Sequence, residues 1–243
     1  MLRKILAGLA LAALVAVPAS AQTLDEVLAS NYKAKGGLDK IKSVQTIKLS
    51  GTMTMGPGLE VPFVMEQKRP MMLRTEITLQ GMTIVQAYDG KNGWQLNPIQ
   101  GRKDPEPIAA DEVKQVEEQA DFDGPLLDYK AKGSTVELLG KEKVEGSDAY
   151  KIKLTLANGD LRYYYLDADS FLEVRVEGKT KIRGTDFESE STIGDYKDEG
   201  GLMMPHAMES GQKGSAQKMK VTITRVELNV PLDAARFRMP VVK

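Results

Sequence analysis

The side chains that most often carry out catalysis are scarce in this chain. Its 243 residues include no cysteine and a single histidine, His206. A thiol nucleophile is therefore excluded, and a serine nucleophile activated by histidine would depend on His206 alone. This histidine follows Pro205 beside Gly200 and Gly201, a setting typical of an exposed or locally hydrogen-bonded side chain. We therefore predict no catalytic residues and no enzymatic activity.

Candidate metal ligands are equally few. One histidine without cysteine builds a zinc or iron site only if carboxylates supply the remaining ligands. Asp121, Asp123 and Asp128 lie close together in the sequence, but they lack the alternating spacing and the closing glutamate of a calcium loop. The glycines form no phosphate-binding motif. We expect neither a metal nor a cofactor.

Methionine is the residue type that points to binding. The chain has 12 methionines against one tryptophan and five phenylalanines. Met53, Met55 and Met65 fall on the apolar faces of two neighbouring predicted strands. Unbranched thioethers repack at low cost, so they suit a cavity that accepts chains of varied shape. The alternative is ordinary filling of the core, which methionine does equally well.

Local patterns predict four helical segments, two of them short. A capping box at 23–26 begins an amphipathic helix that Gly36 ends, and a short helix follows over 38–43. A polar helix is predicted over 108–120, and a short helical piece over 126–130.

Strands dominate the rest of the chain. Apolar and polar residues alternate from residue 47 onward, and the alternation resumes at residue 136 and continues to residue 230. Asn158-Gly159 predicts a hairpin turn, and a change of phase near Arg225 predicts a bulge. These patterns favour a mainly β domain built as an antiparallel meander.

The N-terminus has the layout of a signal peptide. Arg3 and Lys4 precede an apolar run over 5–17 that is short for a membrane span, and Ala-Ser-Ala follows at 19–21. Gln22 stands where a lipid-anchored precursor would have cysteine. We predict that residues 1–21 are removed and that residues 22–243 form one domain in the periplasm, free of a lipid anchor.

The charge balance bears on possible partners. Without residues 1–21 the chain carries 31 basic and 34 acidic side chains, a net charge of −3. This balance argues against binding to nucleic acid. No later stretch is apolar for long enough to be a transmembrane helix.

Three segments carry a family resemblance: Lys68-Arg69-Pro70, residues 89–98 (DGKNGWQLNP) and residues 232–240 (LDAARFRMP). In this order, after a signal peptide and an amphipathic helix, they resemble the periplasmic outer-membrane lipoprotein-sorting carriers, the LolA-like family. Residues 121–126 (DFDGPL) and 194–196 (GDY) are similar to segments of its larger relatives.

The resemblance implies an incomplete antiparallel β-barrel, a half-barrel of about eleven strands, with a helical lid over an apolar cavity. The residues expected in this cavity are Met53, Met55, Phe63, Met65, Trp94 and Leu154, and packing under the sheet is the alternative for Trp94. In the carriers, the arginine of the Arg-Pro motif binds the lid and keeps it closed, and Arg69 holds the matching position. The alternative for Arg69 is a surface arginine at a strand end.

The resemblance also implies a function. It predicts a monomeric carrier that takes lipid acyl chains or lipoproteins towards the outer membrane, between membrane-bound donor and acceptor proteins. A periplasmic envelope-stress sensor or interaction module with the same fold is the alternative. An enzyme acting on an apolar substrate is a third hypothesis, which requires a buried carboxyl group with a raised pKa in the cavity.

Overall fold

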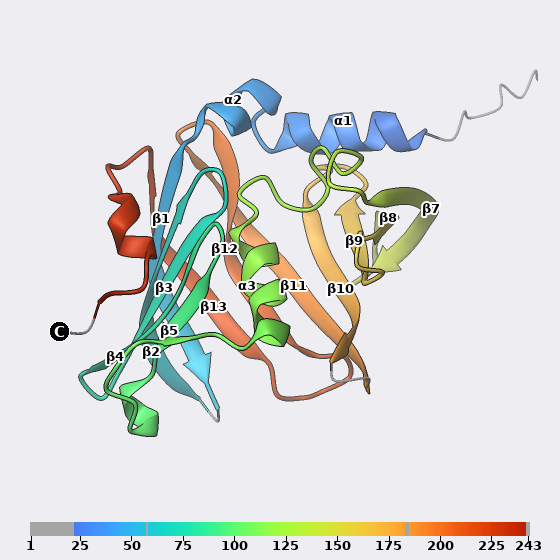
Figure 1. Ribbon diagram of the computed structural model, residues 1–243. Coiled ribbons are helices and arrows are strands. Elements are labelled where there is room, and N and C mark those ends of the chain that lie inside the picture. Colours follow the sequence, from blue (N-terminus) through green and yellow to red (C-terminus); the bar gives the residue numbers. More distant parts are fainter. Residues whose placement is uncertain (1–21, 57, 183–184, 242–243) are drawn as a thin grey trace, which may run out of the picture.

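The fold is a single curved sheet with its three α-helices on one face. The computed structural model describes residues 22–56, 58–182 and 185–241, so the predicted signal peptide lies outside the described residues. In Figure 1 the helices α1 and α2 cross the upper end of the sheet, and α3 stands on its concave side. We call the face that carries these helices the inner face, and the opposite face the outer face.

Two of the predicted helices are confirmed at their expected places. Helix α1 (Leu24–Ala34) begins at Thr23, whose side chain and that of Glu26 form the predicted capping box. Helix α2 (Leu38–Ser43) follows after Gly36, which must be glycine because a Cβ there would lie 2.1 Å from the carbonyl oxygen of Gly201. Helix α1 therefore rests directly on the turn between two strands of the sheet.

The third helix is confirmed with a shorter span, and the helical piece after it is wrong. Helix α3 covers Ala110–Ala120. Residues 126–130 form turns instead of a helix, since Asp128 has φ of 53° and Gly124 has φ of 71°. A residue with positive φ interrupts a right-handed helix.

The strands form one antiparallel sheet with two halves, in the order β6-β5-β4-β3-β2-β1-β13-β12-β11-β10-β9-β8-β7. The first half contains β1 (Thr46–Met55), β2 (Leu59–Lys68), β3 (Met72–Leu79), β4 (Met82–Asp89), β5 (Gly93–Leu96) and β6 (Glu106–Pro107). The second contains β7 (Thr135–Val144), β8 (Ser147–Thr155), β9 (Leu161–Asp167), β10 (Glu173–Ile182), β11 (Thr185–Glu199) and β12 (Leu202–Gln212). Strand β13 (Met219–Leu228) joins the halves by pairing with both β1 and β12.

The sheet stays open, which confirms the predicted half-barrel. Its edge strands β6 and β7 lie at opposite ends of the order, and the described residues show no pairing between them. Thirteen strands replace the expected eleven, in part because the proline-rich segment adds the two-residue strand β6, which pairs with β5. The bulge predicted near Arg225 is confirmed, since the β1–β13 register shifts between Ser50 and Gly51.

Most of the core lies on the inner face, in three groups. One joins the two halves at β1, β2, β12 and β13, one lies under α1, and one lies between α3 and strands β3 and β4. Their central members are Ile47, Leu49, Phe63, Leu202, Val221 and Ile223; Val27, Leu28, Ile152, Leu154 and Leu166; and Leu73, Tyr88, Val116 and Ala120.

The outer face of the first half is covered by the C-terminal segment. The 3₁₀ helix η2 (Ala234–Phe237) packs there, and Phe237 is completely buried. Its carbonyl oxygen accepts a 2.8 Å hydrogen bond from the indole nitrogen of Trp94. Arg236 pairs with the buried carboxylate of Glu66 at 2.9 Å. An arginine and an aromatic anchor therefore hold the end of the chain against the sheet.

Candidate functional site

An apolar cavity lies between the upper end of the sheet and its covering segments. Its volume is about 230 Å³, and its walls come from α1, α2, the loop over 122–127 and strands β1, β9, β10 and β12. The apolar lining includes Ile41, Ile47, Phe122, Leu202 and Met204. The cavity is therefore covered from above by α1, α2 and the 122–127 loop, which are not part of the sheet.

Arg69 ties two of the covering segments to the sheet. It follows the last residue of β2, and its Nε and Nη2 donate to the carbonyl oxygens of Val44 (2.7 Å) and Ile41 (3.0 Å) at the end of α2. Its Nη1 and Nη2 also donate to the two carboxylate oxygens of Asp123, at 2.7 and 2.6 Å. The guanidinium lies 4.3 Å from the ring centre of Phe122.

Arg69 holds α2 and the 122–127 loop together through its hydrogen bonds. A guanidinium offers five fixed donors, and four of its N–H groups are engaged here. The hydrogen bonds from Arg69 hold the pKa of Asp123 below its ordinary value. Arg69 is therefore a half-buried residue in contact with α2 and the loop, which is where a lid lock would have to lie.

The polar end of the cavity centres on a buried carboxylate. Glu173 accepts a hydrogen bond from Lys35 Nζ at 2.9 Å and from the hydroxyl of Tyr196 at 3.3 Å. Burial by itself would raise the pKa of Glu173, but the charge of Lys35 and its hydrogen bond outweigh burial, and the pKa lies below its ordinary value. Glu173 therefore lacks the raised pKa that the enzyme hypothesis requires.

None of the predicted cavity residues whose side chains the structure describes lines the cavity. Met53, Phe63 and Met65 belong to the same apolar group as the lining residues Ile47 and Leu202, but they do not line the cavity themselves. Phe122 packs against this group and also lines the cavity. Leu154 is fully buried under α1. Met55 ends β1, and its side chain lies outside the described part of the chain.

Trp94 lies on the outer face, away from the cavity. It packs with Val85 and Ala87 of β4 beneath the C-terminal segment, and it is 3% exposed. Of the two positions expected for this side chain, packing against the sheet is the one found. The alternation of strand β5 determines this result, because its neighbour Gly93 takes the position that faces Ile108.

The other candidates from the sequence have separate partners. Asp121 pairs with Lys132 at 2.5 Å and Asp128 with Lys42 at 3.1 Å, so the three aspartates of this segment each face a different cation. His206 is buried rather than exposed, with Nδ1 2.8 Å from the carbonyl oxygen of Ile223 and Nε2 2.9 Å from Glu199. It lies in the β12–β13 region as a structural residue.

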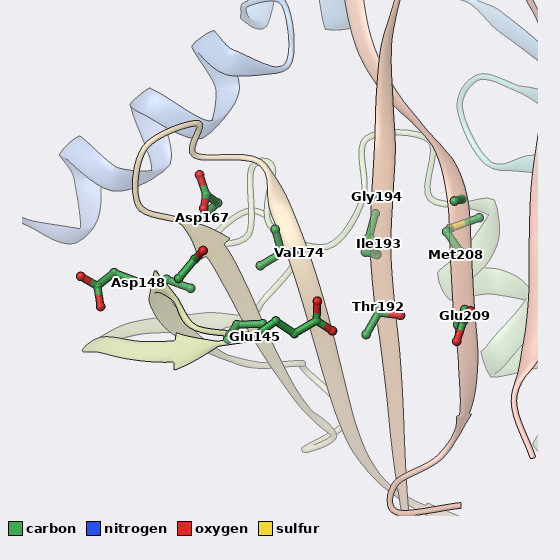
Figure 2. A pocket seen from close by; sticks show the side chains of 13 residues that line it. Glu145, Asp148, Asp167, Val174, Thr192, Ile193, Gly194, Met208 and Glu209 are labelled. Atoms are coloured by element: carbon green, nitrogen blue, oxygen red, sulfur yellow. The ribbon is translucent and has the colours of Figure 1, made fainter. Parts of the chain in front are cut away.

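A second hollow lies on the outer face of the other half. Figure 2 shows Glu145 reaching from the β7–β8 turn towards Thr192, with Glu209 beyond it on β12. The hollow measures about 420 Å³, and small residues of β8, β11 and β12 form its floor. Two of its carboxylates, Asp148 and Glu209, pair with lysines at 2.9 Å. It faces away from the three helices, so it is separate from the apolar cavity.

Comparison with known proteins identifies the fold. The sequence matches no protein-family model and no curated protein. Solved structures do match: a LolA superfamily protein from Nitrosomonas europaea superposes with a TM-score of 0.60 at 14% identity, covering 90% of this chain and 98% of that one. This chain has the LolA-like fold.

Two further structures share the LolA-like fold. A DUF1329 family protein from Desulfovibrio piger gives a TM-score of 0.61 at 14% identity, covering 86% of this chain and 96% of that one. A domain described as an outer membrane lipoprotein-sorting protein, from Vibrio parahaemolyticus, gives 0.58 at 12% identity, covering 87% and 94%. The predicted resemblance is thus confirmed at the level of the fold.

Within the described ranges, none of the helices combines the length and the apolar character needed to cross a membrane.

Two polar contacts of the inner face have no signal in the sequence. Lys35 and Glu173 are separated by 138 residues, and Glu118 and Arg162 by 44. No local spacing brings such residues together. A lysine next to a helix-ending Gly-Gly pair and a glutamate within a predicted strand are, from the sequence alone, ordinary surface residues.

Proposed function

We propose that this protein is a periplasmic carrier that binds the acyl chain of a lipid or lipoprotein in the apolar cavity, without catalysis. The observation that supports this most is the construction of the cavity, because one side chain, Arg69, binds both α2 and the 122–127 loop of its cover. The LolA-like fold and the predicted export signal agree with the proposal.

The size of the cavity implies a closed cover. Its volume of about 230 Å³ is below the roughly 300–1,000 Å³ of common ligand pockets. A long acyl chain therefore fits only when the cover moves and the space extends to Met53, Phe63 and Met65, in the apolar group that Phe122 packs against. Burial of the chain then contributes about 0.8 kcal/mol for each methylene.

Because the acyl chain would be bound mainly by burial of apolar surface, it could also be transferred. An acyl chain held by burial alone leaves when a membrane or a second protein offers a better apolar site. In this proposal the donor and acceptor are membrane-bound partners, and the carrier moves between them as a monomer.

The test combines native mass spectrometry with a cavity-filling substitution. Protein isolated from the periplasm without detergent should carry a lipid, and Met204→Trp should reduce binding of a fluorescent fatty acid about tenfold by filling the space. Met219→Trp is the matched control, because Met219 is 43% exposed and lies outside the cavity. Wild-type protein that carries no lipid and binds no fatty acid would contradict the proposal.

A further inference from the structure

A polar cleft adjoins the apolar cavity on the inner face. Its volume is about 690 Å³, and it lies between α3 and strands β9, β10 and β11. Pro125 and Tyr164 line both the cleft and the cavity, so the two spaces meet at these residues. One amphiphilic molecule can therefore reach both, with its chain in the cavity and its polar end in the cleft.

The centre of the cleft is an ion pair between α3 and the sheet. Arg162 of β9 donates from Nε and Nη2 to the two carboxylate oxygens of Glu118, at 2.9 and 2.6 Å. The arginine side chain is 15% exposed and the glutamate side chain 29% exposed. Arg162 belongs to a strand with neighbours on both sides, whereas Glu118 belongs to a single helix outside the sheet.

Helix α3 is held unequally on its two sides. Towards β3 and β4 it packs through Val116 and Ala120, which are buried. Towards β9 the described contact is the pair between Glu118 and Arg162. Exchange of Glu118 for another anion would release this side of the helix while the apolar contacts remain.

The surroundings of Arg162 favour an anion as the exchanging group. Guanidinium stays charged at all relevant pH values, and its planar donors match phosphate or carboxylate oxygens. Lys114 and Lys181 also line the cleft, and Asp160, the other carboxylate in the lining, accepts hydrogen bonds from Thr180 and Asn158. Gly178 lies beside Arg162 on β10, where a Cβ would come within 3.5 Å of the guanidinium.

We propose that this cleft is an anion-binding subsite, in which the anionic headgroup of an amphiphile displaces Glu118 from Arg162 and frees one side of α3. The inference rests on the proposed function, because the chain of the same amphiphile occupies the apolar cavity. Glu118 acts as an internal competitor for the headgroup, so the empty protein keeps its arginine paired.

If Glu118 competes with the headgroup for Arg162, substitutions of these two residues should change the affinity for an anionic amphiphile in opposite directions. Glu118→Gln removes the competing charge and leaves Arg162 available, so binding of an anionic amphiphile should become tighter. Arg162→Gln removes the group that binds the anion, so binding should become weaker. A pair that served only to fix α3 would make the two variants change in the same direction.

The measurement is isothermal titration with dodecyl phosphate and dodecyl maltoside, both below the concentrations at which they form micelles. The wild type should bind dodecyl phosphate about tenfold more tightly than the maltoside. The ratio of the affinity for dodecyl phosphate to that for dodecyl maltoside should rise several-fold in Glu118→Gln and fall towards one in Arg162→Gln. Lys151→Gln is the control, because Lys151 pairs with Glu142 on the outer face and its loss should leave the ratio unchanged.

Further measurements distinguish a headgroup from free phosphate as the bound anion. They also distinguish failure of the subsite from failure of the carrier function. Inorganic phosphate should bind at least tenfold more weakly than dodecyl phosphate, and equal affinities would overturn the headgroup assignment. Hydrogen exchange in α3 should accelerate with dodecyl phosphate and not with the maltoside. Equal affinities for the two amphiphiles, or a ratio that shifts the same way in both variants, would overturn the subsite. Failure of both amphiphiles to bind would instead contradict the carrier function.

Discussion

The polar end of the cavity depends on one charge neutralising another. Glu173 is buried and its main cation is Lys35, at 2.9 Å. Lys35→Met leaves the carboxylate buried without that partner, and we expect the free energy of unfolding at pH 7 to fall by about 2 kcal/mol, less than for a fully buried pair because Lys35 is partly solvated.

The sign of the pH effect follows from the pKa of Glu173. In the wild type this pKa is lowered, so the group stabilises the fold above the pKa of the unfolded chain and the contribution is lost as the pH falls. Without Lys35 burial raises the pKa, and the variant should recover part of its deficit as the pH falls through the raised value. Urea unfolding at pH 7 and pH 4.5 measures both. In the double variant Lys35→Met/Glu173→Gln, the loss of free energy of unfolding at pH 7 should be smaller than in Lys35→Met. A loss as large as that of Lys35→Met would contradict this account.

Arg69 is the residue whose loss should affect release. Arg69→Leu removes four hydrogen bonds to α2 and Asp123, so we expect fatty-acid release measured by stopped-flow fluorescence to become faster. The free energy of unfolding should also fall, by about 2 kcal/mol, because Asp123 loses its partner. Asp123→Asn keeps the bonds to α2 and should accelerate release less. Equal release rates in the wild type and Arg69→Leu would exclude a role in holding the cover.

Among the elements, η2 offers a direct test because it covers the only tryptophan. Phe237 is fully buried against the outer face near Trp94. Phe237→Ala should lower the free energy of unfolding by about 3–4 kcal/mol through the cavity it leaves. Water reaching the indole should also shift its fluorescence to longer wavelength. Met239→Ala, at a side chain 45% exposed, is the control and should change neither quantity.

The elements also show how far sequence reasoning extends. Helix α1 was predictable because its capping box and apolar spacing are local signals, and the strands because alternation is local. The turns over 126–130 were mispredicted because positive φ at Asp128 leaves no clear mark in the sequence. The position of Arg69 was predictable only from a motif, and this motif does not indicate its partner Asp123. Contacts such as Lys35 with Glu173 arise from the folding of distant segments and have no local signal.

At the scale of the whole molecule, several carboxyl groups make stability depend on pH. Partners lower the pKa values of Asp123, Asp167, Glu173 and Glu190. Their stabilising contributions are complete above the unfolded pKa values of about 4 and are lost as the pH falls through the lower folded values. The free energy of unfolding should therefore be nearly constant between pH 7 and pH 5 and decrease below pH 4. Equal values at pH 7 and pH 3 would contradict this account.

The position of β13 between β1 and β12 determines when the two halves of the sheet can join during synthesis. Ile47 pairs with Leu228, so the junction between the halves joins residues from opposite ends of the chain. Strands β1–β6 and β7–β12 can each pair with sequence neighbours during synthesis, but they unite only after residue 228 is available. Such a long-range closure slows folding. A nascent chain would then hold two separate half-sheets until its last strand arrives, so no intermediate length of the chain can form the finished sheet.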